Sequence, residues 1–161
     1  MQKQQNFIKL IKENEGIIYK ITLVYAFNEE DQKDLYQEIV YQLWKSFDSF
    51  RGGSKISTWM YRIALNTSIT SLKKEKRKGE QVSFNNDLLD RIDQIDTIME
   101  DRIKLLYSHI KQLNTVEKGV ILLYLEGKNY DEIAAITGFT SSNVGTRLNR
   151  IKQKLKSQIK K

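Results

Sequence analysis

The chain contains no cysteine and no proline, a single histidine and only eight glycines in 161 residues. Without cysteine it cannot form disulfide bonds or thiolate metal sites, and one histidine excludes a zinc centre that needs two or more. An average content of about 5% proline would give roughly eight prolines here, so their absence favours long helices. The longest apolar stretch, Ile21 to Phe27, is far shorter than the roughly 18 residues that a membrane span needs. We therefore expect a cytoplasmic protein that does not insert into membranes.

Charge is distributed unevenly along the chain. Lys and Arg number 27 against 20 Asp and Glu, and the formal net charge of +7 suggests a polyanionic partner. An acidic stretch at residues 29–38 is followed by a basic run at 73–78, a second acidic stretch at 87–101, and a tail at 140–161 that contains no acidic residue. Alternating blocks of this kind indicate two basic surfaces joined by an acidic connector.

Apolar residues recur at helical spacing through the first half of the chain. A short helix is predicted around residues 7–11 and a second over 17–25, with Gly16 separating them. A third helix has a broad apolar stripe because large apolar residues recur every four positions; they are Leu35, Ile39, Leu43 and Phe47. Residues 51–54, Arg-Gly-Gly-Ser, are expected to end this helix.

A fourth helix is expected to begin after a cap at Ser57 or Thr58 and to continue into the basic run. Residues 79–97 are polar, acidic and only weakly periodic, so we predict a flexible linker there. The predicted fold is therefore all-α, with two small helical domains at 1–78 and 98–161 joined by that linker.

Four helical segments are predicted after the linker. Thr115 is expected to cap the second of them, and the third runs over residues 130–137 and ends at Gly138. Thr140 or Ser141 can then cap the last helix, which reaches into the basic tail.

The last two helices have the spacing of a helix-turn-helix. Ala134 supplies a small residue where two helices cross, Gly138 is free to turn, and Val144 fills the angle between them. In such a motif, polar side chains of the second helix reach base edges in the major groove and basic ones neutralise phosphates. The candidate contacts are Ser141, Ser142, Asn143, Thr146, Arg147, Asn149, Arg150, Lys152 and Lys154. The alternative is a solvated basic helix over a small core.

Fixed residues at fixed spacing in the first half resemble the second domain of extracytoplasmic-function (ECF, group 4) sigma factors, of the sigma-70 family of bacterial RNA polymerase. The matching landmarks are Asp34-Leu35-x-Gln37-Glu38, Leu43-Trp44, Phe50-Arg51-Gly52, Thr58-Trp59 and Tyr61-Arg62-Ile63-Ala64-x-Asn66. Residues 113–155 resemble the fourth domain of the same family. The resemblance implies a specificity subunit that binds core polymerase and directs promoter-specific initiation, without enzymatic activity, cofactor or metal of its own.

The resemblance also assigns roles to residues. Docking on the clamp helices of the polymerase is implied for Asp34, Gln37, Glu38, Gln42 and Trp44, although Trp44 fits a place in the core equally well. The polymerase flap is implied as a second contact of the chain. Recognition of the single-stranded minus-10 element is implied for Phe50, Arg51, Gly52, Lys55, Arg62, Asn66, Lys73, Lys74 and Arg77. An ion pair within the fold is the alternative for Arg62. Recognition of the double-stranded minus-35 element is implied for the helix-turn-helix contacts named above.

One departure from the family concerns the recognition helix. Gly145 stands where family members often carry Lys or Arg, which removes a contact and costs about 1 kcal/mol of helix propensity. The minus-35 preference therefore does not follow from the sequence.

Other functions remain open at this point. One is a helix-turn-helix regulator that acts without polymerase, and another is a sigma mimic that only binds an anti-sigma factor. The linker length would let such an inhibitor clamp the two domains together, so an anti-sigma factor is also a candidate partner of a working sigma factor. The acidic stretch at 29–38 suggests a divalent-metal nuclease, but no histidine or activated nucleophile accompanies it.

Overall fold

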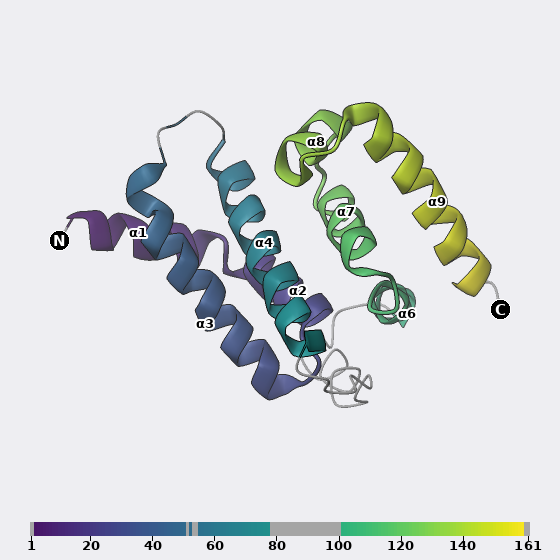
Figure 1. The fold of residues 1–161 in the computed structure, drawn as a ribbon, viewed down its shortest axis with the longest axis horizontal. Helices are drawn as coiled ribbons and strands as arrows, with labels where there is room; N and C mark the ends of the chain where they lie inside the picture. Colours follow the sequence, from purple (N-terminus) through teal and green to yellow (C-terminus); the bar gives the residue numbers. More distant parts are fainter. Residues whose placement is uncertain (1, 51, 53–54, 78–100, 160–161) are drawn as a thin grey trace. The chain divides into compact units, whose positions relative to one another are not determined.

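The computed structural model describes residues 2–50, 52, 55–77 and 101–159 (Figure 1). The chain divides into two compact units, Met1–Val82 and Ser83–Lys161. Within the described ranges all regular secondary structure is helical, as the sequence predicts. The predicted linker at 79–97 lies outside the described residues. Each described helix is too short or too polar to cross a bilayer.

The first unit begins with α1 (Gln2–Glu13) and α2 (Glu15–Tyr25). The prediction that Gly16 separates them is wrong, because Gly16 lies in the first turn of α2 and the break is at Asn14. The Asn14 side-chain amide donates to the Leu10 carbonyl at 2.8 Å. Asparagine side chains compete in this way with backbone hydrogen bonds and interrupt helices, whereas a single glycine is tolerated inside one.

The third helix, α3 (Glu29–Ser46), presents the predicted apolar stripe. Three of its members are buried, with exposed fractions of 6% for Leu35 and 0% for Ile39 and Leu43. The fourth, Phe47, lies beyond the helix in the short 3-10 turn η1 (Phe47–Ser49). The helix therefore ends before the predicted stop at residues 51–54.

The fourth helix, α4 (Ile56–Arg77), begins earlier than predicted. A cap at Ser57 or Thr58 is wrong, since both residues lie within the helix and Thr58 is buried among its neighbours. A β-branched hydroxyl residue can serve as a cap or fill a first turn, and burial places Thr58 in the turn.

Helices α2, α3 and α4 pack against one another around the core of the first unit. Four polar residues are buried in the described part of this unit as well: Thr22, Gln32, Thr58 and Ser68. The Gln32 amide donates to the Thr22 hydroxyl at 3.2 Å. Because this hydrogen bond partly satisfies both groups, their burial is less costly than that of unpaired polar groups.

The second unit contains α6 (Asp101–Ile110), α7 (Thr115–Leu125), α8 (Tyr130–Thr137) and α9 (Ser141–Ile159). Helix α9 packs against the other three. Its buried stripe consists of Val144, Leu148, Ile151 and Leu155.

Asparagines cap both inner helices of this unit. The predicted cap at Thr115 is wrong by one residue, because Asn114 has the extended backbone of a cap and its side chain accepts from the Glu117 N–H at 2.8 Å. Asn129 and Glu132 form the same capping box at the start of α8. At the start of α9 the Thr140 hydroxyl accepts from the Asn143 N–H at 3.1 Å, so of the two predicted caps Thr140 is confirmed.

Two lysines are buried beside each other in the second unit. Lys111 is 2% exposed and Lys118 is 5% exposed. Burial, and secondly the charge of Lys118, lower the pKa of Lys111 to about 7. The ammonium form of Lys111 is therefore disfavoured in the folded protein.

Candidate functional site

Helices α8 and α9 form the helix-turn-helix pair that the spacing predicts. Helix α8 ends at Gly138, whose φ of 87° is the left-handed conformation that closes many helices. Beyond the turn, Val144 is 0% exposed, as its predicted place in the angle between the helices requires. Ile133 and Leu148 are also fully buried there. The second helix is thereby fixed with its opposite face outward.

The outward face of α9 carries most of the predicted base-contacting side chains. Five of them are exposed: Ser142, Asn143, Thr146, Asn149 and Arg150. Amide and guanidinium groups in a major groove can form paired hydrogen bonds with adenine and guanine. This face therefore has the chemistry of a duplex-reading surface.

Two other predicted contacts on α9 are engaged within the unit. Ser141 donates through its hydroxyl to the Asp131 carboxylate of α8. The Arg147 guanidinium lies 4.2 Å from the centre of the Phe139 ring and donates to the Asn143 side chain at 2.6 Å. These contacts orient the start of α9 against the turn.

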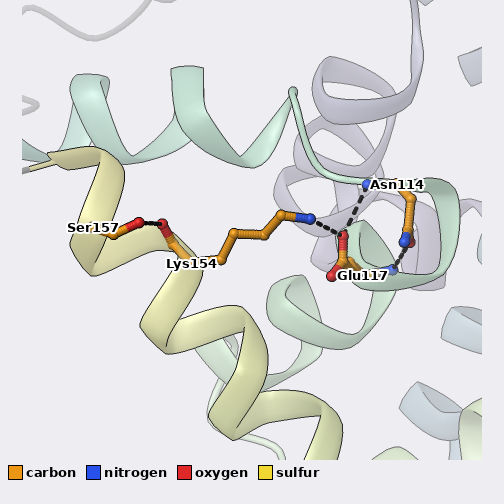
Figure 2. A network of polar contacts seen from close by, with 4 residues as sticks. All are labelled: Asn114, Glu117, Lys154 and Ser157. Atoms are coloured by element: carbon orange, nitrogen blue, oxygen red, sulfur yellow. Dashed lines mark hydrogen bonds and ion pairs between the residues drawn. The ribbon is translucent and has the colours of Figure 1, made fainter.

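Both predicted lysines of the tail contact side chains of α7. The Lys152 ammonium lies 4.1 Å from the centre of the Tyr124 ring. A hydrogen bond with Tyr124 raises the pKa of Lys152, so its positive charge is maintained. The Lys154 ammonium pairs with the Glu117 carboxylate (Figure 2), and 3.3 Å separates Nζ from Oε1.

Sequence reasoning missed the residues that hold these side chains. Glu117, Tyr124 and Phe139 belong to α7 or the turn, and Tyr130 opens α8 and packs against Gly145. The contacts to α7 join residues far apart in sequence, so helical periodicity could not reveal them.

In the first unit, a groove of about 530 Å³ runs between α3 and α4. From α3 it is lined by Asp34, Glu38 and Gln42, which were predicted to dock on polymerase. From α4 it is lined by Asn66 and Lys74, which were predicted to contact the minus-10 strand. The structure thus brings two predicted residue sets into one groove.

The groove is polar along its rim. Asp34, Glu38, Asn66 and Lys74 are exposed, and the Gln42 amide donates to the Glu38 carboxylate at 2.9 Å. Several carboxylates line it, but among the described residues no three Asp, Glu, His or Cys side chains form a group that could hold a metal ion.

Trp44 lies away from this groove in a cluster of aromatic rings. Its ring centre is 5.1 Å from that of Phe7 on α1, in an edge-on arrangement, and the Lys3 ammonium lies 4.3 Å from it. Phe7 also meets Phe47 at 5.4 Å. Trp44 is half-buried by these contacts, which fits the core interpretation left open for it.

The remaining predicted minus-10 contacts lie around the loop between η1 and α4. Phe50 is half-buried, with its ring centre 5.3 Å from that of Trp59. Gly52 has a φ of 76°. Lys55, Arg62 and Lys73 are exposed. The predicted contact Arg51 and the side chain of Arg77 lie outside the described residues, and Gln37 is exposed on α3.

Comparison with family models gives two matches. A model of sigma-70 region 2 matches residues 10–78, and a model of sigma-70 region 4 matches residues 103–155. The two matched regions each fall within one compact unit.

Curated relatives match over most of their length. RNA polymerase sigma factor YlaC of Bacillus subtilis is 30% identical, with 89% of this chain and 88% of that protein covered. RNA polymerase sigma factor SigV of the same organism is 27% identical, with 100% and 98% covered. The ECF RNA polymerase sigma-E factor of Escherichia coli K12 is 28% identical, with 80% and 74% covered.

Two solved structures are similar in fold. The sigma factor RpoE of Bartonella quintana, in complex with the anti-sigma factor NepR, has a TM-score of 0.77 at 17% identity, with 97% of this chain and 98% of that chain covered. CnrH, in complex with the cytosolic domain of CnrY, has a TM-score of 0.69 at 18% identity, with 98% and 89% covered.

Proposed function

The chain belongs to the sigma-70 family, as an ECF-type RNA polymerase sigma factor, and we propose how its two units divide promoter recognition and polymerase binding. The first unit docks on core polymerase and recognises the minus-10 element as a single strand. The second recognises the minus-35 element as a duplex. The observation that carries the proposal is the correspondence of the two family regions with the two compact units, in family order.

Polymerase docking is assigned to the exposed face of α3. Asp34, Gln37 and Glu38 are exposed there and carry two negative charges one helical turn apart. When an acidic helix face meets a basic coiled coil, the opposite charges raise the association rate and fix the register of the complex more than they raise its affinity. We assign the clamp helices of polymerase to this face, and the flap to the second unit.

Minus-10 recognition is assigned to α4 and the loop before it. Asn66 projects an exposed amide at the groove, where it can bond the Watson-Crick edge of an extruded base. Phe50, held by Trp59, offers an aromatic wall, and Lys55, Lys73 and Lys74 can follow the backbone. Melting costs about 1.4 kcal/mol for each base step, so several such contacts must act together.

Minus-35 recognition is assigned to α9. Asn149 and Arg150 are exposed on its outward face and suit adenine and guanine respectively. Arg150→Ala should therefore relax the preference at one base pair of the upstream element. The protein contributes specificity and strand opening, while polymerase supplies the bond-forming chemistry, so we propose no enzymatic activity, and we place its action in the bacterial cytoplasm.

An inhibitory partner is a further part of the proposal. The solved structure of the Bartonella quintana sigma factor contains the anti-sigma factor NepR. Its fold similarity to this chain supports a search for a partner of the same class.

The test is run-off transcription with core polymerase over a genomic library. The wild-type chain should direct initiation from promoters that share two elements. Glu38→Lys should reduce association with core polymerase, while Glu30→Lys, an equal charge change at an exposed residue of α3 outside the groove, should not. A chain that binds duplex DNA but not core polymerase would be a regulator of another kind, and the proposal would be wrong.

A further inference from the structure

The Glu117 carboxylate joins the start of α7 to the tail of α9. Its Oε1 accepts from the Asn114 backbone N–H at 3.1 Å and also from the Lys154 ammonium at 3.3 Å (Figure 2). The Glu117 side chain is 17% exposed, whereas that of Lys154 is 48% exposed. Glu117 is therefore held by its own capping box, and Lys154 reaches across to it.

We propose that Glu117 is a positioning residue that sets the strength of sequence-independent DNA binding, by holding Lys154 out of contact with phosphate. The inference rests on the proposed duplex recognition by α9. It differs from the sequence-based expectation, in which Lys154 itself neutralises a phosphate.

Competition between two anions for one ammonium is the physical basis. A bound phosphate and the Glu117 carboxylate both attract Lys154, but the carboxylate is already in place and fixed by the Asn114 N–H. It cannot follow the lysine toward DNA without giving up the capping box, which contributes about 1 kcal/mol to the start of α7. Within the described structure Arg150 makes no comparable ion pair, so its charge stays available on the same helix.

Glu117→Gln separates the two roles of this side chain. Glutamine still accepts from the Asn114 N–H, because capping boxes use Gln as well as Glu, so α7 keeps its cap. It no longer carries the charge that holds Lys154. Each additional phosphate contact steepens the slope of log affinity against log salt by about 0.9 on duplex DNA.

The chain provides a matched control in its second capping box. Glu132 occupies the same position in α8, accepts from the Asn129 N–H at 3.2 Å and pairs with Lys128 at 3.7 Å. Neither residue belongs to α9. Glu132→Gln therefore removes one negative charge from a capping box that glutamine can maintain, and it releases Lys128 rather than Lys154.

The experiment measures binding of the full chain to duplexes of random sequence and of the selected upstream element, between about 50 and 200 mM salt. Glu117→Gln should bind both duplexes more tightly, by about threefold or more, with a slope steeper by about 0.9 and the same base preference. Lys154→Ala should leave the slope unchanged. The double variant should behave like Lys154→Ala.

Four results would overturn the inference. Lys154→Ala alone could flatten the slope by about 0.9, which would show that Lys154 contacts phosphate with Glu117 in place. Glu117→Gln could bind both duplexes like wild type, which would show that Glu117 does not restrain Lys154. Glu132→Gln could change the salt slope as much as Glu117→Gln does, which would leave only an effect of net charge. A wild-type chain that binds neither duplex would overturn the proposed function as well, whereas the other results leave it intact.

Discussion

The ring of Tyr130 lies against the backbone of Gly145, so that a Cβ built on Gly145 would stand 3.2 Å from Tyr130 Cε2. This separation is shorter than most side-chain contacts, so a side chain at position 145 requires the Tyr130 ring to shift by a few tenths of an ångström. The glycine in the recognition helix thus accommodates an aromatic neighbour from α8. Its departure from the family pattern has a packing explanation within this unit.

Substitution of Gly145 should depend on Tyr130. In wild type, Gly145→Ala should change the free energy of unfolding by less than about 0.5 kcal/mol, because the gain in helix propensity is offset by displacement of the ring. In a Tyr130→Ala background the same change should stabilise by about 1 kcal/mol. A double-mutant cycle from chemical denaturation measures this coupling. Equal effects in both backgrounds would show that the contact carries no energy.

Lys111 should make the stability of the second unit depend on pH. Its pKa is about 7 in the folded unit, because of burial and then Lys118, and about 10.4 in the unfolded chain. The unfolded chain binds more protons between these values, so stability should rise as pH increases through that window, by about 2 kcal/mol between about pH 7 and pH 9. Below about pH 7 Lys111 is protonated in both the folded and the unfolded chain, so the full free-energy cost of burying its charge is present.

Lys111→Met keeps the volume of the side chain and removes this titration. The variant should be more stable than wild type below about pH 7 and should lack the rise at higher pH. Both tryptophans, Trp44 and Trp59, lie in the first unit, so tryptophan fluorescence does not report on the second. Hydrogen exchange of amides in α7 and α9 therefore measures the stability of the second unit. The same pH slope in both proteins would contradict the assignment to Lys111.

Phe7 should anchor α1 to the aromatic cluster of the first unit. Phe7→Leu removes two edge-on ring contacts, at 5.1 Å to Trp44 and 5.4 Å to Phe47. Such contacts contribute about 0.5–1.5 kcal/mol each, so the first unit should lose about 2 kcal/mol. Tryptophan fluorescence in denaturant reports this loss. Ile8→Ala, next to it on α1 and 52% exposed, should change stability by less than about 0.5 kcal/mol.

Asn66 should affect strand opening without affecting the fold. Its side chain is exposed, so Asn66→Ala should change stability by less than about 0.5 kcal/mol. Loss of hydrogen bonds to a captured base should reduce open-complex formation by about tenfold, with polymerase association unchanged. Permanganate reactivity of minus-10 thymines measures the opening. Thr70→Ala, one turn further along the same groove, is the control, and an equal loss there would argue against base capture by Asn66.

The helix-turn-helix could be predicted from the sequence because its constraints are local. Gly138 must adopt a positive φ and Val144 must fill the angle between two adjacent helices, so few residue types fit either position. The stripe on α3 was predictable for a similar reason, since burial on one face imposes a fixed period.

Helix starts and long-range pairs could not be predicted in the same way. Asn114 and Thr115 are both good capping residues, and only the extended backbone of Asn114 decides between them. The Lys154–Glu117 pair joins positions 37 residues apart, so it depends on how α9 crosses α7. The shared groove of α3 and α4 has the same origin, because each helix alone shows only half of it.

Helix α8 is closed at both ends by its own chain, at the Asn129–Glu132 box and at Gly138. The angle at which α9 leaves the turn is consequently set before any partner is met. A duplex-binding element that is already ordered loses little conformational entropy when it docks. Its encounter with DNA should therefore be limited by diffusion and collision geometry rather than by a slow folding step.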